Sequence, residues 1–153
     1  MASEESCRTA GEVGDLMTPE PTTVPADTPV GEAWRMMTER RFRHMPVVKD
    51  GGSLVGIVTQ SDMLVAARGT GQRIDFDNER PVSEVMNQEV DTVRPENCAA
   101  EAARHMLRTK RSCLPVVDET GALVGILTEA DYMRLATRGA PPCSCGGVTA
   151  ADS

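Results

Sequence analysis

The chain has 153 residues and a formal net charge of −7, and this acidic balance argues against binding along the phosphate backbone of a nucleic acid. Aromatic residues make up 3% of the sequence, too few for a platform on which single-stranded bases would stack. No apolar run approaches the roughly 18 residues of a membrane helix, and the N-terminus lacks a basic segment followed by an apolar one, so we expect a cytoplasmic protein without a membrane segment.

The chain contains an internal repeat, in which residues 16–67 align without a gap with residues 85–136. The motif Gly-Ile-Val-Thr-Gln-Ser-Asp at residues 56–62 returns as Gly-Ile-Leu-Thr-Glu-Ala-Asp at residues 125–131, an offset of 69. Motifs that recur in the same order indicate two copies of one structural unit. The predicted organisation is a flexible N-terminus (1–12), a first unit (13–75), a linker (76–81), a second unit (82–138) and a flexible tail (139–153).

Each unit begins with a short extended segment, residues 22–25 or 91–94, and continues into a helix. Thr28 is the expected cap of the first helix, with Pro29 at the first helical position, and Asn97 is the expected cap in the second unit. Apolar residues then recur at i, i+3, i+4 and i+7, the spacing of one helix face. They are Val30, Ala33, Trp34 and Met37 in the first unit, and Ala99, Ala102, Ala103 and Met106 in the second.

Two apolar strands and a second helix complete each unit. The expected strands are residues 45–48, 54–58, 114–117 and 123–127, and the expected final helices are residues 61–68 and 130–138. The second strand of each pair is apolar without alternation, which indicates that both of its faces are covered. The order β-α-β-β-α, with a right-handed crossover between parallel strands, predicts an α/β (α+β) fold. Two such units are expected to cover each other around a pseudo-twofold axis.

The repeated Thr-x-x-Asp before each final helix has two interpretations. By pattern it is a capping box, with Thr59 and Thr128 as N-caps and Asp62 and Asp131 three positions later. The glycine inside each preceding strand also indicates a bulge or the close approach of another group. An ionised Asp accepts hydrogen bonds only, so a pair of ribose hydroxyls is a natural partner. With the free N–H groups of a helix start for a phosphate, the motif then suits a nucleotide.

Basic residues are concentrated around the end of each first helix. They are Arg35, Arg40, Arg41, Arg43, Arg104, Arg108, Lys110 and Arg111. The preference of cations for helix C-termini explains most of them. A few remain available to contact a phosphate.

The tandem units, each with Thr-Val before its helix, a Pro-Val-Val strand and the Gly-x-x-Thr-x-x-Asp motif, resemble a pair of CBS domains (cystathionine β-synthase-type), also called a Bateman module. The resemblance implies a regulatory protein that binds AMP, ADP, ATP or S-adenosylmethionine in clefts between the units, with no cofactor required for chemistry. It also implies a stand-alone homodimer that changes conformation with its ligand and acts on an unknown protein target.

The resemblance further implies which residues would hold the ligand. Asp62 and Asp131 would bind the ribose, and Thr59 and Thr128 would contact ribose or phosphate. The implied adenine slots are Thr22, Thr23, Val24, Met45, Pro46 and Val47 in the first unit, and Asp91, Thr92, Val93, Leu114, Pro115 and Val116 in the second. Asp91 departs from its counterpart Thr22, and its charge is expected to repel phosphate and weaken the second site.

Other functions remain open at this stage. Neither a catalytic residue nor a metal site is expected, because His44 and His105 do not occupy matching repeat positions and Cys113 is best explained as a small buried hydrophobe. One alternative is an association scaffold that binds no ligand. Another is redox or metal sensing through Cys143 and Cys145 in the tail, although the five cysteines are expected to be reduced.

Overall fold

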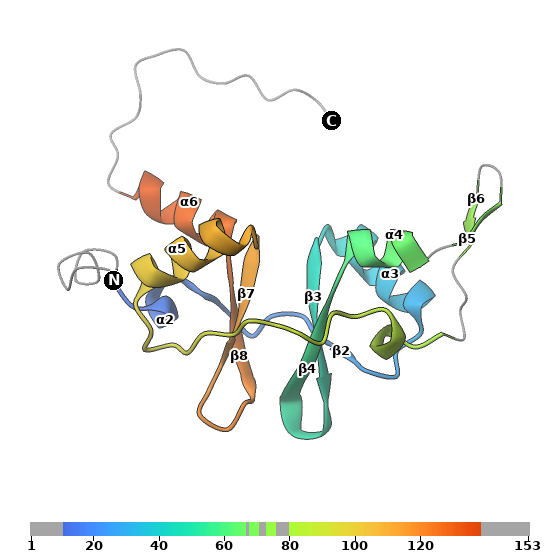
Figure 1. The fold of residues 1–153 in the computed structure, drawn as a ribbon, viewed down its shortest axis with the longest axis horizontal. Helices are drawn as coiled ribbons and strands as arrows, with labels where there is room; N and C mark the ends of the chain where they lie inside the picture. The colour runs from blue at the N-terminus through green and yellow to red at the C-terminus, as the bar shows by residue number, and fades with distance from the viewer. Residues whose placement is uncertain (1–10, 67, 71–72, 76–79, 139–153) are drawn as a thin grey trace, which may run out of the picture.

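A computed structural model describes residues 11–66, 68–70, 73–75 and 80–138 of the chain. The predicted flexible N-terminus and tail therefore lie almost wholly outside the described residues, as do Cys143 and Cys145 and most of the predicted linker. Two similar halves lie side by side, with their sheets in the middle of the molecule and their helices on the outside (Figure 1).

The first half consists of β2 (Val24–Pro25), α3 (Val30–Arg40), β3 (His44–Lys49), the 3-10 turn η1 (Asp50–Gly52), β4 (Ser53–Thr59) and α4 (Gln60–Ala66). The second half consists of α5 (Ala99–Thr109), β7 (Cys113–Val117), β8 (Leu123–Thr128) and α6 (Glu129–Thr137). The remaining elements are α2 (Val13–Leu16), β1 (Thr18–Pro19), the hairpin of β5 (Arg68–Thr70) and β6 (Arg73–Asp75), and the 3-10 helix η2 (Val82–Glu84).

The strand pairing confirms the predicted order and fold class. In the first half β2 runs parallel to β3, with Val24 opposite Val47, and β3 runs antiparallel to β4. The second half repeats the antiparallel pair β7–β8 but reduces the parallel strand to one bridge, between Val93 and Val116. Thus both halves have the β-α-β-β-α order, and a crossover helix joins the parallel segments of each.

The predicted helix caps Thr28 and Asn97 are wrong. Helix α3 begins at Val30 after an extended Pro29, and no side chain caps it. The reason is tertiary: the Thr28 carbonyl accepts the Val82 N–H at 2.8 Å, which keeps the backbone before the helix extended. Asn97 instead accepts the Arg94 N–H at 2.8 Å and closes the turn that precedes α5.

The segment that leads each unit packs against the other half. Val13 is fully buried in the second half's core, where Leu16 and Met17 also pack, and β1 pairs with β8. In the same way Val82 is buried in the core of the first half. This exchange ties the two halves together through apolar contacts, which the sequence repeat alone did not indicate.

The exchanged segments explain the glycine in each central strand. A Cβ atom on Gly56 would lie 2.6 Å from the Met86 sulfur, and one on Gly125 would lie 2.5 Å from the Met17 sulfur. The expected close approach is therefore made by the methionines of the exchanged segments. Opposite Gly56 and Gly125, the pairing register also shifts, so the predicted bulge is present as well.

The cysteines divide into two cases. Cys113 is a free, buried thiol, and burial raises its pKa to about 12, in keeping with the predicted role as a small hydrophobe. Cys98 is disulfide-bonded, which contradicts the expectation that every cysteine is reduced. That expectation came from the predicted cellular compartment, which does not show whether a partly exposed thiol lies near another cysteine.

Candidate functional site

The Thr-x-x-Asp motifs form capping boxes at both final helices. In the first half the Thr59 N–H donates to Asp62 Oδ2 at 3.0 Å, and the Asp62 N–H donates to Thr59 Oγ1 at 3.1 Å. In the second half the Thr128 N–H donates to Asp131 Oδ2 at 2.8 Å, and the reciprocal bond is also made. The predicted caps are thus confirmed, and each carboxylate is fixed at the start of its helix.

The two motif regions meet at the junction between the halves. The Ser112 hydroxyl and His44 Nε2 lie 2.7 Å apart and connect the start of β7 to the start of β3. The Gln60 N–H donates to the Arg43 carbonyl, and at the matching position the Glu129 N–H donates to the Ser112 carbonyl. His44 therefore lies among residues that belong to the first turns of both α4 and α6.

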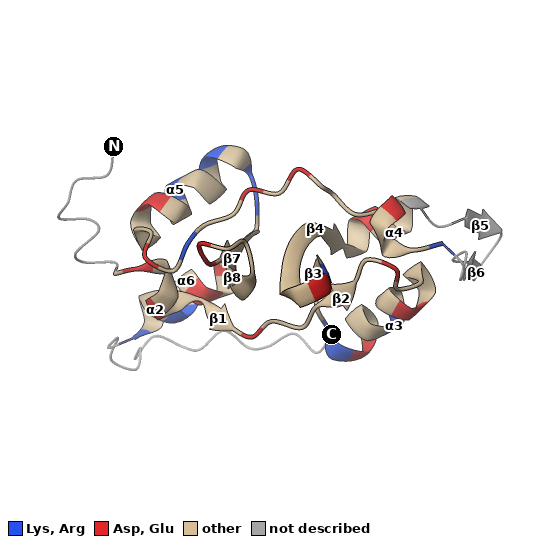
Figure 2. Ribbon diagram, turned by 90° about the horizontal axis from the view of Figure 1, so that it is seen from below, with Lys and Arg blue, Asp and Glu red and all other residues tan. Residues whose placement is uncertain are grey.

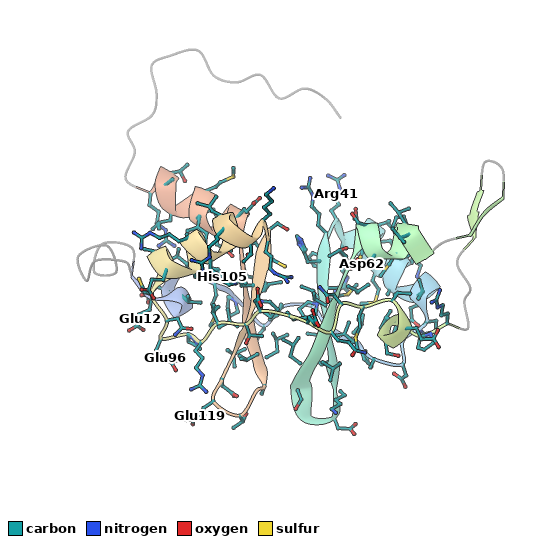
Figure 3. The ribbon with its side chains drawn as sticks, in the orientation of Figure 1. Glu12, Arg41, Asp62, Glu96, His105 and Glu119 are labelled. Atoms are coloured by element: carbon teal, nitrogen blue, oxygen red, sulfur yellow. The ribbon has the colours of Figure 1, made fainter. Side chains whose placement is uncertain are left out.

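Charge at this junction acts on His44 in both directions. Burial lowers the pKa of His44, and the Arg43 guanidinium lowers it further, whereas the carboxylates of Glu129 and Asp62 act to raise it. Both acids are thus within electrostatic range of the imidazole. Figure 3 shows Asp62 beside the start of α4 and Arg41 near the upper end of β3 in the same half.

Asp131 is enclosed by hydrogen-bond donors. Only 3% of the residue is exposed. Its Oδ1 accepts the Thr18 hydroxyl at 3.1 Å and also the guanidinium of Arg134, while Oδ2 accepts the Thr128 N–H and, at 3.2 Å, the Thr128 hydroxyl. Asp62 is half-buried and makes the capping contacts with Thr59.

The second half carries an ion-paired cluster around Asp91. Its Oδ2 contacts His105 Nε2 at 3.0 Å and Arg111 Nε at 3.1 Å, and Arg108 lies 3.3 Å from the other ring nitrogen of His105. The hydrogen bond from His105 is the main reason that the pKa of Asp91 is lowered, and Arg111 adds to it. The charge of Asp91, which the sequence suggested would repel phosphate, is partly offset by the guanidinium of Arg111.

The remaining predicted slot residues lie on or beside the parallel segments. In the first half Val24, Met45, Pro46 and Val47 are buried, and Thr22 and Thr23 are half-buried just before β2. In the second half Leu114, Pro115 and Val116 are buried, whereas Thr92 is exposed. Thr92 and Val93 line a surface cavity of about 590 Å³ with the loop that follows β7, at the opposite end of that strand from Thr128.

Sequence reasoning missed four residues of this region: Thr18, His44, Ser112 and Arg134. Arg134 had a usable signal, since it stands three residues after Asp131 on one helix face. Thr18 is 113 residues from Asp131, and no local pattern joins them. Of the basic residues expected near phosphate, Arg35 and Arg104 lie in the middle of α3 and α5, and the others lie at or just after the C-terminal ends of these helices, on opposite halves of the molecule (Figure 2).

Two classes of site find no support among the described residues. No three His, Cys, Asp or Glu side chains in the described ranges are grouped so as to hold a metal ion. None of the described helices combines the length and the apolar character that a membrane crossing requires.

Comparisons with known proteins agree with this arrangement. The CBS domain family model matches residues 13–69 and 82–138. Homoserine O-acetyltransferase of Methanococcoides burtonii is 34% identical over 123 residues, which are 80% of this chain but 24% of that enzyme. Most of that relative therefore lies outside the similarity.

Solved structures share the fold over most of the chain. The structure of CBSX2 in complex with AMP aligns with a TM-score of 0.72 and 33% identity, covering 82% of this chain and 95% of that one; CBSX2 comes from Arabidopsis thaliana. The CBS domain pair of protein MJ0100 in complex with 5'-methylthioadenosine and S-adenosyl-L-methionine aligns with a TM-score of 0.69 and 28% identity, covering 83% and 96%.

Proposed function

Because this chain belongs to the CBS-domain family, with two CBS domains in tandem, we propose that it is a regulatory protein that binds an adenosine-containing ligand. Two similar CBS pairs hold such ligands in their solved structures, AMP in one and S-adenosylmethionine with methylthioadenosine in the other. The relatives named as enzymes are matched over a minor part of their length. The similarity therefore supports a regulatory role and gives no support for the reactions of those enzymes.

The observation that carries this proposal is the fixed carboxylate of Asp62 at the junction of the halves. The Thr59 N–H holds its Oδ2, so the carboxylate is oriented before any ligand arrives. An oriented carboxylate can accept both hydroxyls of a ribose, and hydrogen bonds to a charged group contribute about 1.5–3 kcal/mol each. The arginines at the end of α3, among them Arg41, supply positive charge in the same half for a phosphate.

The ligand would act by population shift. A molecule that contacts both halves stabilises the relative orientation in which those contacts form, in proportion to its difference in affinity for the two orientations. The His44–Ser112 contact lies at the same junction, so it would respond to any change in that orientation. A partner protein would then recognise one orientation.

Thermal unfolding with a panel of AMP, ADP, ATP and S-adenosylmethionine tests the proposal. At a hundredfold excess over Kd a ligand adds about 2.7 kcal/mol, which is a rise in Tm of roughly 5–11 °C for a chain of this size. Asp62→Asn should reduce the rise by about half or more, and Asp50→Asn, in an exposed turn away from the junction, is the matched control. If no panel member shifts Tm or gives heat in calorimetry, the proposal is wrong.

A second candidate function is association through an apolar surface. Leu64 and Val65 on α4 and Met133 on α6 are large hydrophobic side chains that are 45%, 89% and 71% exposed. Large apolar side chains that are this exposed are typical of an interface. We propose that these residues contribute to a homodimer, which is compatible with ligand binding at the junction.

A further inference from the structure

We infer that the ligand binds at only one of the two matching positions, the one at Asp62. At the other position the carboxylate of Asp131 has a structural role, because its hydrogen bonds to the protein leave no acceptor for a ligand. The inference rests on the proposed function, because it selects between the two places where that function would be carried out. It departs from the symmetry of the repeat, in which Thr59 and Asp62 match Thr128 and Asp131.

The acceptor capacity of Asp131 is already filled. An ionised carboxylate offers about four lone-pair positions, and Asp131 accepts four hydrogen bonds, from Thr18, from Arg134 and two from Thr128. The side chain is 1% exposed. A ribose could reach this carboxylate only by displacing Thr18 or Arg134, which are exposed residues, so each hydrogen bond from the ribose would replace one that the carboxylate already accepts and would add little affinity.

The carboxylate of Asp62, unlike that of Asp131, has acceptor capacity left for a ligand. Within the residues that the structure describes, the Thr59 N–H is the one donor that reaches the Asp62 carboxylate, and it reaches Oδ2. The Thr59 hydroxyl accepts the Asp62 N–H. Oδ1 therefore remains available for a ligand hydroxyl, on a side chain that is only half-buried.

Two substitutions between the repeats cause this difference. The backbones match, because Thr18 pairs with Ile126 and its counterpart Asn87 pairs with Ile57. The Asn87 side chain, however, turns away and accepts the Glu89 N–H at 3.1 Å. The counterpart of Arg134 is Val65, which has no donor and is 89% exposed.

The predicted adenine slot of the second half also differs from that of the first half in a way that disfavours a ligand. Asp91, His105 and Arg111 form the ion-paired cluster there. Their counterparts in the first half are Thr22, Met36 and Phe42, which are neutral and half-buried. An adenine ring would contact apolar surface in the first half, but in the second it would have to desolvate the charged side chains of Asp91 and Arg111.

Isothermal titration calorimetry with AMP, and with S-adenosylmethionine as a second probe, tests the inference. Wild type should bind one ligand per chain. Asp62→Asn should weaken binding on the order of 10- to 150-fold, whereas Asp131→Asn should leave affinity within a few-fold while lowering Tm. Two ligands per chain, or equal losses in the two variants, would overturn the inference and leave the proposed function intact.

A second variant covers the case in which Asp131→Asn does not fold. Thr18→Val combined with Arg134→Met keeps the Asp131 carboxylate and its cap but removes two of its donors. Since neither residue contacts Asp62, the affinity of the first position should be unchanged. A tenfold loss would mean that the second position takes part in binding and would overturn the inference. A wild type that binds neither these probes nor the other panel nucleotides is a different result, because it overturns the proposed function itself.

Discussion

The His44 imidazole and the Ser112 hydroxyl, 68 residues apart in the sequence, lie 2.7 Å apart and join the two halves of the molecule. His44 begins β3 in the first half, and Ser112 precedes β7 in the second. Around this contact lie Arg43, Asp62 and Glu129, so the junction contains one titratable ring between charges of both signs. The protonation state of His44 therefore depends on the relative position of the two halves.

Stability should depend on pH through His44. Burial and Arg43 lower its pKa in the folded state, so the unfolded chain, with an ordinary value near 6.5, binds the proton more readily. The stabilisation is fully present above about pH 6.5 and is lost as the pH falls through the lowered pKa of the folded state. Urea unfolding at pH 7.5, 6.5 and 5.5 measures this loss.

The variant His44→Gln isolates this contribution. Glutamine does not titrate, so the stability difference between wild type and variant should shrink as the pH falls. Ser112→Ala should cost about 0.5–1.5 kcal/mol at pH 7.5, the net value of one hydrogen bond. A wild type and a His44→Gln variant with the same pH profile would show that the ring does not control this junction.

The central-strand glycines should not tolerate alanine. At Gly56 a Cβ atom would lie 2.6 Å from the Met86 sulfur and 2.9 Å from the Asn87 carbonyl oxygen, and the latter is backbone and cannot turn aside. At Gly125 the matching backbone oxygen, of Thr18, is 3.1 Å away. Overpacking of this kind costs about 1–3 kcal/mol, and Gly56→Ala should cost more than Gly125→Ala in denaturant unfolding.

A double-mutant cycle checks the cause. Met17→Ala should relieve Gly125→Ala more completely than Met86→Ala relieves Gly56→Ala, because the Asn87 oxygen stays in place. Additive losses in both cycles would mean that the methionines are not what the glycines accommodate.

Sequence patterns over a few residues correctly predicted the features that depend on interactions between near neighbours in the sequence. The capping boxes at Thr59 and Thr128, and the strand that carries Gly56, follow from residues a few positions apart. The exchange of the leading segments does not, because Val13 and Val82 carry no sign of which half buries them. That same exchange overrode the predicted cap at Thr28, through the hydrogen bond from Val82.

The candidate site also contains features that the sequence predicted and features that only the structure shows. The repeat identified Asp62 and Asp131 as equivalent, and the capping geometry of both residues confirms that equivalence. Their difference arises from Arg134, whose counterpart is Val65, and from Thr18, which donates to Asp131 from 113 residues away and whose counterpart Asn87 bonds to Glu89 instead. The repeat therefore identified both positions, and one local substitution (Arg134 for Val65) and one tertiary contact (from Thr18) distinguish them.

The cap at Thr128 should matter for stability. Thr128→Ala removes a hydroxyl that satisfies the Asp131 N–H and donates to the Asp131 carboxylate. Loss of an N-cap costs about 0.5–2 kcal/mol, which corresponds to a fall in Tm of a few degrees for a chain of this size. Thr137→Ala, at the exposed end of the same helix, is the control and should leave Tm nearly unchanged. Equal effects of the two substitutions would contradict a specific role for the cap.

The proposed homodimer should depend on α4 and α6. Val65→Glu and Met133→Glu place charges on side chains that are already exposed in the single chain, so the fold should persist while an apolar interface is lost. Leu107→Glu is the matched control, because Leu107 is 81% exposed but lies on α5. Sedimentation equilibrium should show a dimer for wild type and for Leu107→Glu, and a monomer for the other two variants. A monomeric wild type, or dissociation caused equally by Leu107→Glu, would mean that these two helices do not form the interface.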